Sequence, residues 1–320
     1  ELVQAKAEEY AHQSAEEGGK PLIDSRIELF RAVQGIREAA QSISKLTGHE
    51  IPMNLTSSSM NRMALTTREP IGLVAAISAF NHPFNLIVHQ VIPAVAVGCP
   101  VIIKPARTTP LSCLNLVNCL YEAGLPKEWC QMVVCESSLA EKLVTDSRVA
   151  FFSFIGSGEI GWMLRSKLSP GTRCALEHGG AAPVIIDHDA DLDDALPLLA
   201  KGGFYHAGQV CVSVQKVFVH ESRLDEFRKK LVKLAEKLVV GDPTDEKTEV
   251  GPLIQENEVN RVHQWVNEAK MAGAKILTGG KKIGNTCYAP TVILNPPDEA
   301  MVSTHEIFGP VINIYSFKDR

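Results

Sequence analysis

The feature that most constrains the fold is an alternation of short apolar segments and longer helical segments between residues 71 and 177. Parallel strands need crossover connections of this kind, and a sheet covered by helices on both faces has strands that are apolar throughout. The sequence therefore predicts a parallel sheet. The predicted strands span 71–80, 100–106, 129–135, 149–156 and 173–177, and the predicted helices span 85–98, 112–124, 139–145 and 159–168.

A second α/β unit follows, so we predict two domains, 1–178 and 179–320. Before the first sheet, residues 1–46 predict two helices, and the polar stretch 53–69 predicts a surface hairpin. The second unit is predicted from strands at 183–187, 214–220, 275–278 and 288–294 and from helices at 191–203, 223–238 and 257–272.

The composition excludes several classes of protein. The chain has 320 residues, enough for two cores, and a net charge of −5, which gives no electrostatic basis for binding nucleic acid. No apolar run reaches the roughly 18 residues of a membrane helix. The eight cysteines contain no Cys-x-x-Cys pair, so we expect no metal site and a reducing, cytoplasmic location. Six are interpreted as core thiols in helices or strands: Cys99, Cys113, Cys119, Cys130, Cys135 and Cys174.

Glycines after the fourth predicted strand form a G-x-G-x-x-G pattern at Gly156, Gly158 and Gly161. This pattern is typical of dinucleotide binding, although an ordinary Rossmann fold carries it after the first strand. Glu177 ends the next strand and has three interpretations: a ribose ligand, a partly desolvated base that releases an acyl group from a thiol, or an ordinary solvated carboxylate.

Cys211 lies between a Gly-Gln-Val turn and a predicted strand of the second domain. A single cysteine is usually a core residue, so this interpretation depends on the other motifs. In chain order these are SAFNHPFN at 78–85, GCPVIIKPA at 98–106, FIGSGEIG at 154–161, LEHGG at 176–180, GQVC at 208–211 and HEIFGPV at 305–311. Together they resemble the aldehyde dehydrogenase superfamily, across essentially the whole chain.

The resemblance implies a Rossmann-like cofactor domain over 1–178, an α/β catalytic domain over 179–320, and oxidation of a small aldehyde to its carboxylic acid. Cys211 would attack the aldehyde as a thiolate and form a thiohemiacetal. The Asn81 amide and the Cys211 backbone N–H would form the oxyanion hole. After hydride transfer to NAD or NADP, Glu177 would activate water to hydrolyse the thioester.

The resemblance also implies a set of cofactor-binding residues. Lys104 would bind the adenosine ribose, Ser157 the pyrophosphate and Glu306 the nicotinamide ribose. Arg107 stands where NAD-preferring members often have glutamate, so we predict a preference relaxed toward NADP. The remaining members of the set are Ser78, Phe80, Gly156, Gly161 and Phe308, and further departures from the common pattern are Phe80, His82, His178 and His206.

Two other functions stay open at this point. A CoA-acylating semialdehyde dehydrogenase would lack the base that Glu177 provides, and a non-catalytic family member would act as a structural or binding protein. The resemblance implies further segments at both ends, so we expect the chain to be an incomplete catalytic unit with little activity by itself. The full-length protein would form a homodimer or homotetramer, with the hairpin at 53–69 as an assembly element.

Overall fold

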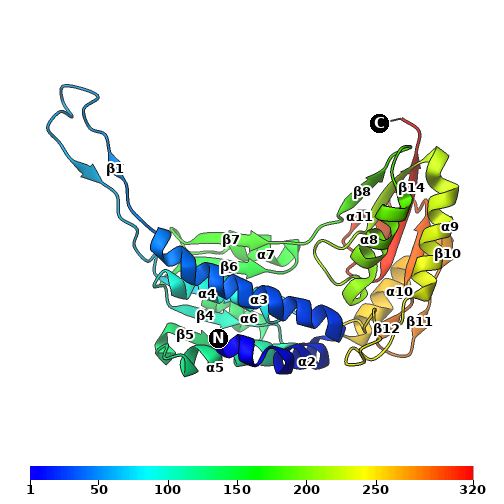
Figure 1. The fold of residues 1–320 in the computed structure, drawn as a ribbon, viewed down its shortest axis with the longest axis horizontal. Helices are drawn as coiled ribbons and strands as arrows, with labels where there is room; N and C mark the ends of the chain where they lie inside the picture. The colour runs from blue at the N-terminus through cyan, green and yellow to red at the C-terminus, as the bar shows by residue number, and fades with distance from the viewer. Residues whose placement is uncertain (320) are drawn as a thin grey trace.

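The computed structural model describes residues 1–319 as two α/β bodies, each around a five-stranded sheet (Figure 1). The first sheet is parallel throughout and has the order β5-β4-β3-β6-β7, which confirms the predicted parallel sheet. Its first strand in the chain lies at the centre, so the strand order reverses between β3 and β6, where open α/β sheets bind ligands. The strands are β3 (Leu73–Ile77), β4 (Val101–Lys104), β5 (Cys130–Met132), β6 (Val149–Ile155) and β7 (Arg173–Glu177).

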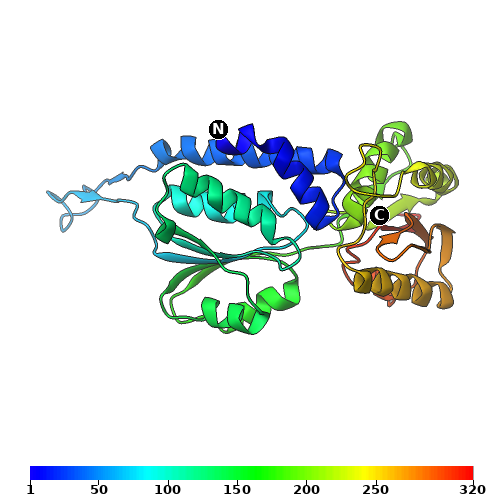
Figure 2. The ribbon, with the colours of Figure 1, turned by 90° about the horizontal axis from the view of Figure 1, so that it is seen from below.

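Helices cover both faces of this sheet (Figure 2). On one face, α4 (Asn85–Ala96) and α5 (Pro110–Glu122) share a core with the N-terminal helices. On the other face, α6 (Ser137–Val144) and α7 (Gly158–Ser166) contribute to a smaller core. A short 3-10 turn, η2 (Lys127–Trp129), precedes β5.

The strand predicted at 129–135 is shorter than expected. The apolar pattern predicts a strand to residue 135, but β5 ends at Met132, and Val133 and Val134 continue as a loop. Cys135 therefore lies in a loop and is only half-buried, which corrects its interpretation as a core thiol in a strand. The Val133 N–H still donates to the Ile103 carbonyl of β4 at 2.9 Å, and the segment leaves the carboxyl end of the sheet after that bond.

Three helices, instead of two, precede the sheet: α1 (Leu2–Ala5), α2 (Ala7–Gly18) and α3 (Leu22–Ser42). The break falls at Lys6, whose ψ of 14° leaves the helical range. A 3-10 turn, η1 (Ile43–Lys45), leads into a hairpin of β1 (Glu50–Ile51) and β2 (Ala64–Leu65), which projects from the body (Figure 1). The predicted surface hairpin is present, with its paired strands starting slightly earlier than residue 53.

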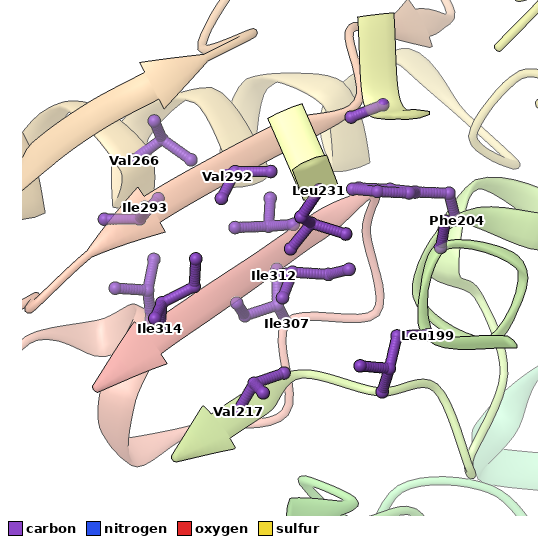
Figure 3. Close-up of a cluster of buried hydrophobic side chains, with 14 of the residues drawn as sticks. Leu199, Phe204, Val217, Leu231, Val266, Val292, Ile293, Ile307, Ile312 and Ile314 are labelled. Atoms are coloured by element: carbon purple, nitrogen blue, oxygen red, sulfur yellow. The ribbon is translucent and has the colours of Figure 1, made fainter. Parts of the chain in front are cut away.

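The second sheet has the order β10-β13-β14-β9-β8, and only the β10–β13 pair is antiparallel. Its apolar side chains, with those of the surrounding helices, form the largest buried cluster (Figure 3). The elements are β8 (Pro183–Ile186), α8 (Leu192–Phe204), η3 (Tyr205–Gly208), β9 (Lys216–His220), α9 (Glu221–Lys237), α10 (Glu256–Met271), β10 (Lys275–Thr278), β11 (Lys282–Ile283), β12 (Cys287–Tyr288), β13 (Thr291–Leu294), α11 (Met301–Thr304) and β14 (Val311–Phe317).

The turn between α2 and α3 contacts the second body. The Leu22 N–H donates to the Pro243 carbonyl at 2.8 Å, and the Asp24 carboxylate pairs with Lys201 at 2.6 Å. The first sheet ends at Glu177 and the second begins at Pro183, while the domain boundary at 178 stays a prediction. No helix within residues 1–319 has both the length and the apolarity to cross a membrane.

Candidate active site

A cavity of about 710 Å³ opens at the carboxyl end of the first sheet, between the two bodies. The three predicted catalytic residues, Asn81, Glu177 and Cys211, all line it, although they lie on three separate segments of the chain. Six of the predicted cofactor residues line the same cavity: Ser78, Phe80, Gly156, Ser157, Glu306 and Phe308. The fold therefore brings together most of the side chains that the motifs predicted.

Cys211 lies just after a strained turn. His206, Ala207 and Gly208 have φ values of 50°, 53° and 70°, which is the left-handed region that side chains with a Cβ rarely adopt. Gln209 stabilises the turn, because its Nε2 donates to the carbonyls of His206 and Pro252, both at 3.2 Å. Strain of this kind persists only where surrounding contacts fix it, as they do next to the candidate nucleophile.

The electrostatics around Cys211 keep its thiol protonated at rest. Burial raises the pKa of the Cys211 thiol, and the negative charges of Glu177 and Glu306 raise it further. The backbone N–H groups of Cys211 and Val212 act in the opposite direction, since they favour the thiolate. The reactive form of the thiol is therefore expected to increase when the negative charge in the cavity is reduced.

Glu177 is exposed at the end of β7, although its apolar neighbours in the sequence predicted partial desolvation. Alternate residues of β7 are exposed, so Glu177 lies on the side of the strand that opens to the cavity. Its carboxylate makes no hydrogen bond or ion pair within residues 1–319. A carboxylate in this setting can contact water directly, as a base that activates water must.

Asn81 is buried, with 4% of its surface exposed, in the bend between β3 and α4. Its burial in the cavity wall suits an amide that donates to a charged oxygen, because a donor is most effective where water is excluded. His82, the next residue, is also largely buried, and burial together with the charge of Lys20 lowers its pKa to about 3. His82 is therefore neutral near pH 7, and its ring meets the ring of His206 edge-on, with the centroids 6.3 Å apart.

The residues of the cavity wall fit a dinucleotide. Ser157 precedes the first residue of α7 and makes no capping bond of its own, so this helix start is open to an anion. The Ser78 hydroxyl and the Gln90 amide oxygen both line the wall, buried and without a hydrogen-bond partner within the described residues. Buried polar atoms of this kind usually find a partner, and the hydroxyls of a nucleotide would supply one.

Three predicted cofactor residues do not line the cavity. Lys104 is 9% exposed at the end of β4, where its ammonium donates to the Pro105 carbonyl at 3.2 Å and burial lowers its pKa. Arg107 is exposed and pairs with Glu136 at 2.8 Å. Gly161 is buried in α7 against Phe154 and His178, and a Cβ there would collide with the imidazole. Its role in the structure is close packing of the helix on the sheet.

Glu306 and Phe308 complete the wall on the second body. The Glu306 carboxylate accepts from the Gly180 N–H at 3.3 Å, and burial raises its pKa. Phe308 has a φ of 47°, and its ring meets the Phe80 ring edge-on at 5.8 Å. These contacts join the segment at 305–311 to the linker that follows β7 and to the segment between β3 and α4.

Sequence reasoning missed Gln90. Its Nε2 donates to the Ile77 carbonyl at 3.1 Å, to the Ser153 carbonyl at 3.2 Å and to the Ser153 hydroxyl at 3.0 Å. It thereby ties β3 to β6 at the point where the strand order reverses. The signal in the sequence was an uncharged polar residue inside the apolar helix predicted at 85–98, which is costly to bury without partners.

Comparison with known proteins agrees with this site. The model of the aldehyde dehydrogenase family matches residues 1–320. The chain is 40% identical over 320 residues to 3-sulfolactaldehyde dehydrogenase from Priestia aryabhattai. The aligned region covers 100% of this chain and 67% of that protein.

Two solved structures share the fold. Glyceraldehyde-3-phosphate dehydrogenase GapN from Methanocaldococcus jannaschii, complexed with NADP, has a TM-score of 0.93 and 34% identity over 99% of this chain and 69% of that one. An NAD-dependent aldehyde dehydrogenase from Sinorhizobium meliloti has a TM-score of 0.94 and 33% identity over 99% of this chain and 63% of that one.

The chain thus spans about two thirds of the length of these relatives. Both nicotinamide cofactors occur among the solved structures, in line with the predicted cofactor class of NAD or NADP. The likeness over the whole chain also confirms the predicted α/β fold and the resemblance drawn from the six motifs. The chain belongs to the aldehyde dehydrogenase family.

Proposed function

We propose that the protein oxidises a small aldehyde to its carboxylic acid with NAD or NADP, through a thioester on Cys211. The observation that carries this proposal is the cavity in which Asn81, Glu177 and Cys211 meet beside the open start of α7. A nucleophile, an oxyanion donor and a water-activating base around one cavity are the groups that acyl chemistry on a thiol needs.

In the first step, the Cys211 thiol gives its proton to water, its sulfur forms a bond to the aldehyde carbon, and the carbonyl oxygen becomes an alkoxide. The Asn81 amide and the Cys211 N–H donate to that oxygen and stabilise its charge. A nicotinamide cofactor held by Ser157 and Glu306 would supply the hydride acceptor for this carbon. The carbonyl of a thioester re-forms as the hydride departs, with Cys211 still covalently attached to the acyl group.

In the second step, Glu177 takes a proton from water while the water oxygen attacks the thioester carbon. The carbon–sulfur bond then breaks, which releases the carboxylic acid and returns the thiolate of Cys211. The exposure of the Glu177 carboxylate supports this role, because water must reach it in each cycle. A CoA-acylating enzyme would use the CoA thiol as the acceptor and would need no such base.

The cofactor would lie along the wall formed by Ser78, Ser157 and Glu306. Ser157 at the start of α7 would receive the pyrophosphate, since helix N-termini favour anions. Glu306 would accept from the hydroxyls of the nicotinamide ribose. We also propose a homodimer or homotetramer in the cytoplasm, with the exposed hairpin of β1 and β2 as an assembly element.

The test is a panel of short aldehydes presented to the full-length protein, with formation of NADH or NADPH followed by absorbance. We expect turnover with at least one aldehyde without added CoA, and release of the free acid. Turnover that depends on CoA would establish the acylating reaction instead. Binding of aldehyde or cofactor without turnover would establish the non-catalytic alternative.

A further inference from the structure

A buried ion pair lies behind the oxyanion segment, outside the cavity. Lys20 and Glu28 contact each other directly and are 1% and 2% exposed. A charge this far from water is costly unless it is paired and hydrogen-bonded, so its partners indicate what it does. Neither residue belongs to the set that the motifs predicted.

The partners of Glu28 lie at the start of α4. Its Oε1 accepts from the backbone N–H groups of Phe84 and Asn85, both at 2.9 Å, and its Oε2 accepts from Lys20 and from the Ser14 hydroxyl at 3.4 Å. The first N–H groups of a helix have no partner within the helix, and α4 has no side-chain cap of its own. Glu28 therefore caps a helix that begins 57 residues further along the chain.

This cap acts on the segment that carries Asn81. The Leu86 N–H donates to the His82 carbonyl at 3.0 Å, so the residue after Asn81 already belongs to the first turn that Glu28 fixes. Asn81 is attached to β3 on its other side, which ends at Ile77. The direction of its amide thus depends on two anchors, the sheet and the cap.

The turn between α2 and α3, which carries Lys20, also supports the segment of the proposed nucleophile. Gly19 packs against Gly251 and Pro252, and the Pro252 carbonyl accepts from Gln209, which stabilises the strained turn before Cys211. The turn between α2 and α3 therefore supports the segments of both donors of the proposed oxyanion hole, the Asn81 amide and the Cys211 N–H.

We propose that Glu28, neutralised by Lys20, is a positioning residue that holds the Asn81 amide in line with the oxyanion. The inference rests on the proposed function, because it gives Asn81 the role of oxyanion donor. Burial by itself would raise the pKa of Glu28, but Lys20 and the other donors more than offset it, so the pKa is lowered and the carboxylate stays charged. A charged acceptor binds backbone N–H groups more strongly than a neutral one.

A second cap of the same kind provides a matched control. Glu17 of α2 accepts from the Leu111 and Ser112 N–H groups at the start of α5, both at 2.8 Å. Helix α5 follows β4 and carries no part of the oxyanion segment. Removal of this cap should cost stability in a similar way, without any energetic link to Asn81.

The test is a double-mutant cycle in the full-length protein, with the rate of the first burst of NAD(P)H as the readout. In the unaltered protein, Asn81→Ala should slow the burst by about 10²–10³-fold, the usual cost of one oxyanion donor. Lys20→Met/Glu28→Leu removes the cap without leaving an unpaired buried charge, a replacement that folded proteins often tolerate. We expect it to slow the burst by about 10²-fold, and Asn81→Ala to cost less than about threefold in that background.

Two further variants separate positioning from general damage. Lys20→Met/Glu28→Gln keeps an amide oxygen that can accept from the same N–H groups, so it should recover most of the burst rate. Glu17→Leu should leave the full cost of Asn81→Ala in place. Hydrogen exchange of the Phe84 and Asn85 amides should accelerate in Lys20→Met/Glu28→Leu while the α5 amides keep their protection.

The outcomes distinguish the two proposals. An equal cost of Asn81→Ala in both backgrounds, or unchanged exchange at Phe84 and Asn85, would overturn the positioning role alone. If Asn81→Ala has no effect in the unaltered protein, the oxyanion assignment fails, and the role of Glu28 fails with it.

Discussion

Two carboxylates on opposite sides of the cavity wall differ in almost every respect. Glu28 is buried and accepts from Lys20, a serine hydroxyl and two backbone N–H groups, whereas Glu177 is exposed and bonds to no group in residues 1–319. A carboxylate with all its acceptor sites filled can orient a segment but cannot exchange protons with water. A carboxylate with free acceptor sites can do so, and this difference supports the proposed structural role of Glu28 and the proposed chemical role of Glu177.

The same contrast holds for the segments around them. Close to Glu28, the start of α4 is fixed by hydrogen bonds within the first body, and the turn before Cys211 is fixed by hydrogen bonds within the second. Around Glu177 and Ser78, polar atoms face the cavity without protein partners. We therefore expect substitutions near Glu28 to slow the formation of the covalent intermediate, and substitutions near Glu177 to affect its breakdown or the binding of cofactor.

The largest expected effect is at Cys211, the proposed nucleophile. Cys211→Ser should lower steady turnover by about 10⁴-fold or more, as loss of a nucleophile does in other enzymes of acyl transfer. Cys287 is a matched control, because it is also a half-buried thiol whose pKa is raised by burial. Cys287→Ser should leave turnover unchanged. Normal turnover by Cys211→Ser would remove the basis of the proposed reaction.

Glu177→Gln should separate the two steps. Without a base, steady turnover should fall by about 10²–10⁴-fold, while the initial burst of NAD(P)H keeps its rate. Lys20→Met/Glu28→Leu should show the reverse, with a slow burst and no accumulation of thioester. Rapid-mixing kinetics measure both phases. If Glu177→Gln instead weakened cofactor affinity at normal turnover, Glu177 would be a ribose ligand.

The pH dependence of the thiol gives a smaller effect. The pKa of Cys211 lies above its usual value of 9.0, so the rate of alkylation by iodoacetamide should rise about tenfold per pH unit from pH 7 to 9. Glu177 contributes to this raised pKa, so Glu177→Gln should lower it and accelerate alkylation at pH 7.5 by about threefold. Lys20→Met/Glu28→Gln should not change the pH dependence of Cys211 alkylation, because the native Lys20–Glu28 pair has no net charge to lose. If Glu177→Gln alkylated at the same rate as the unaltered protein across this pH range, the electrostatic argument would be contradicted.

The first sheet could be predicted from the sequence because its signal is local. Each strand is a short apolar run, and each following helix has enough length to show its pattern. The prediction fails at 133–135, where apolar residues leave the sheet, and at Lys6, where a break in backbone geometry has no counterpart in the residue pattern.

The three residues that meet at the candidate site could be proposed from the sequence because six motifs occur in order. The cap from Glu28 to α4 was not, because its two ends lie 57 residues apart and each looks ordinary in its own helix. The exposure of Glu177 also depends on what lies across the cavity. In both cases the property belongs to the contact between distant segments and not to either segment.

A further expected effect concerns Arg107 and the choice of cofactor. Its ion pair with Glu136 joins two exposed side chains, with 60% and 67% of their surfaces accessible. Exposed pairs of this kind contribute about 0–1 kcal/mol, so the pair can open when a 2′-phosphate offers a better partner. The guanidinium can then donate two parallel hydrogen bonds to that phosphate.

Arg107→Glu should therefore lower the ratio of kcat/KM for NADP over NAD, by roughly tenfold, because it replaces an attraction with a repulsion. Glu136→Gln should raise the ratio by about threefold, since it frees Arg107 and removes a negative charge near the same phosphate. Arg148, which comes just before β6, is a matched control because it is exposed and paired with Asp146. Arg148→Glu should leave the ratio unchanged. Steady-state kinetics with both cofactors give all three ratios. If Arg107→Glu and Arg148→Glu behave alike, Arg107 does not read the cofactor, and the choice between NAD and NADP is made by other residues along the wall.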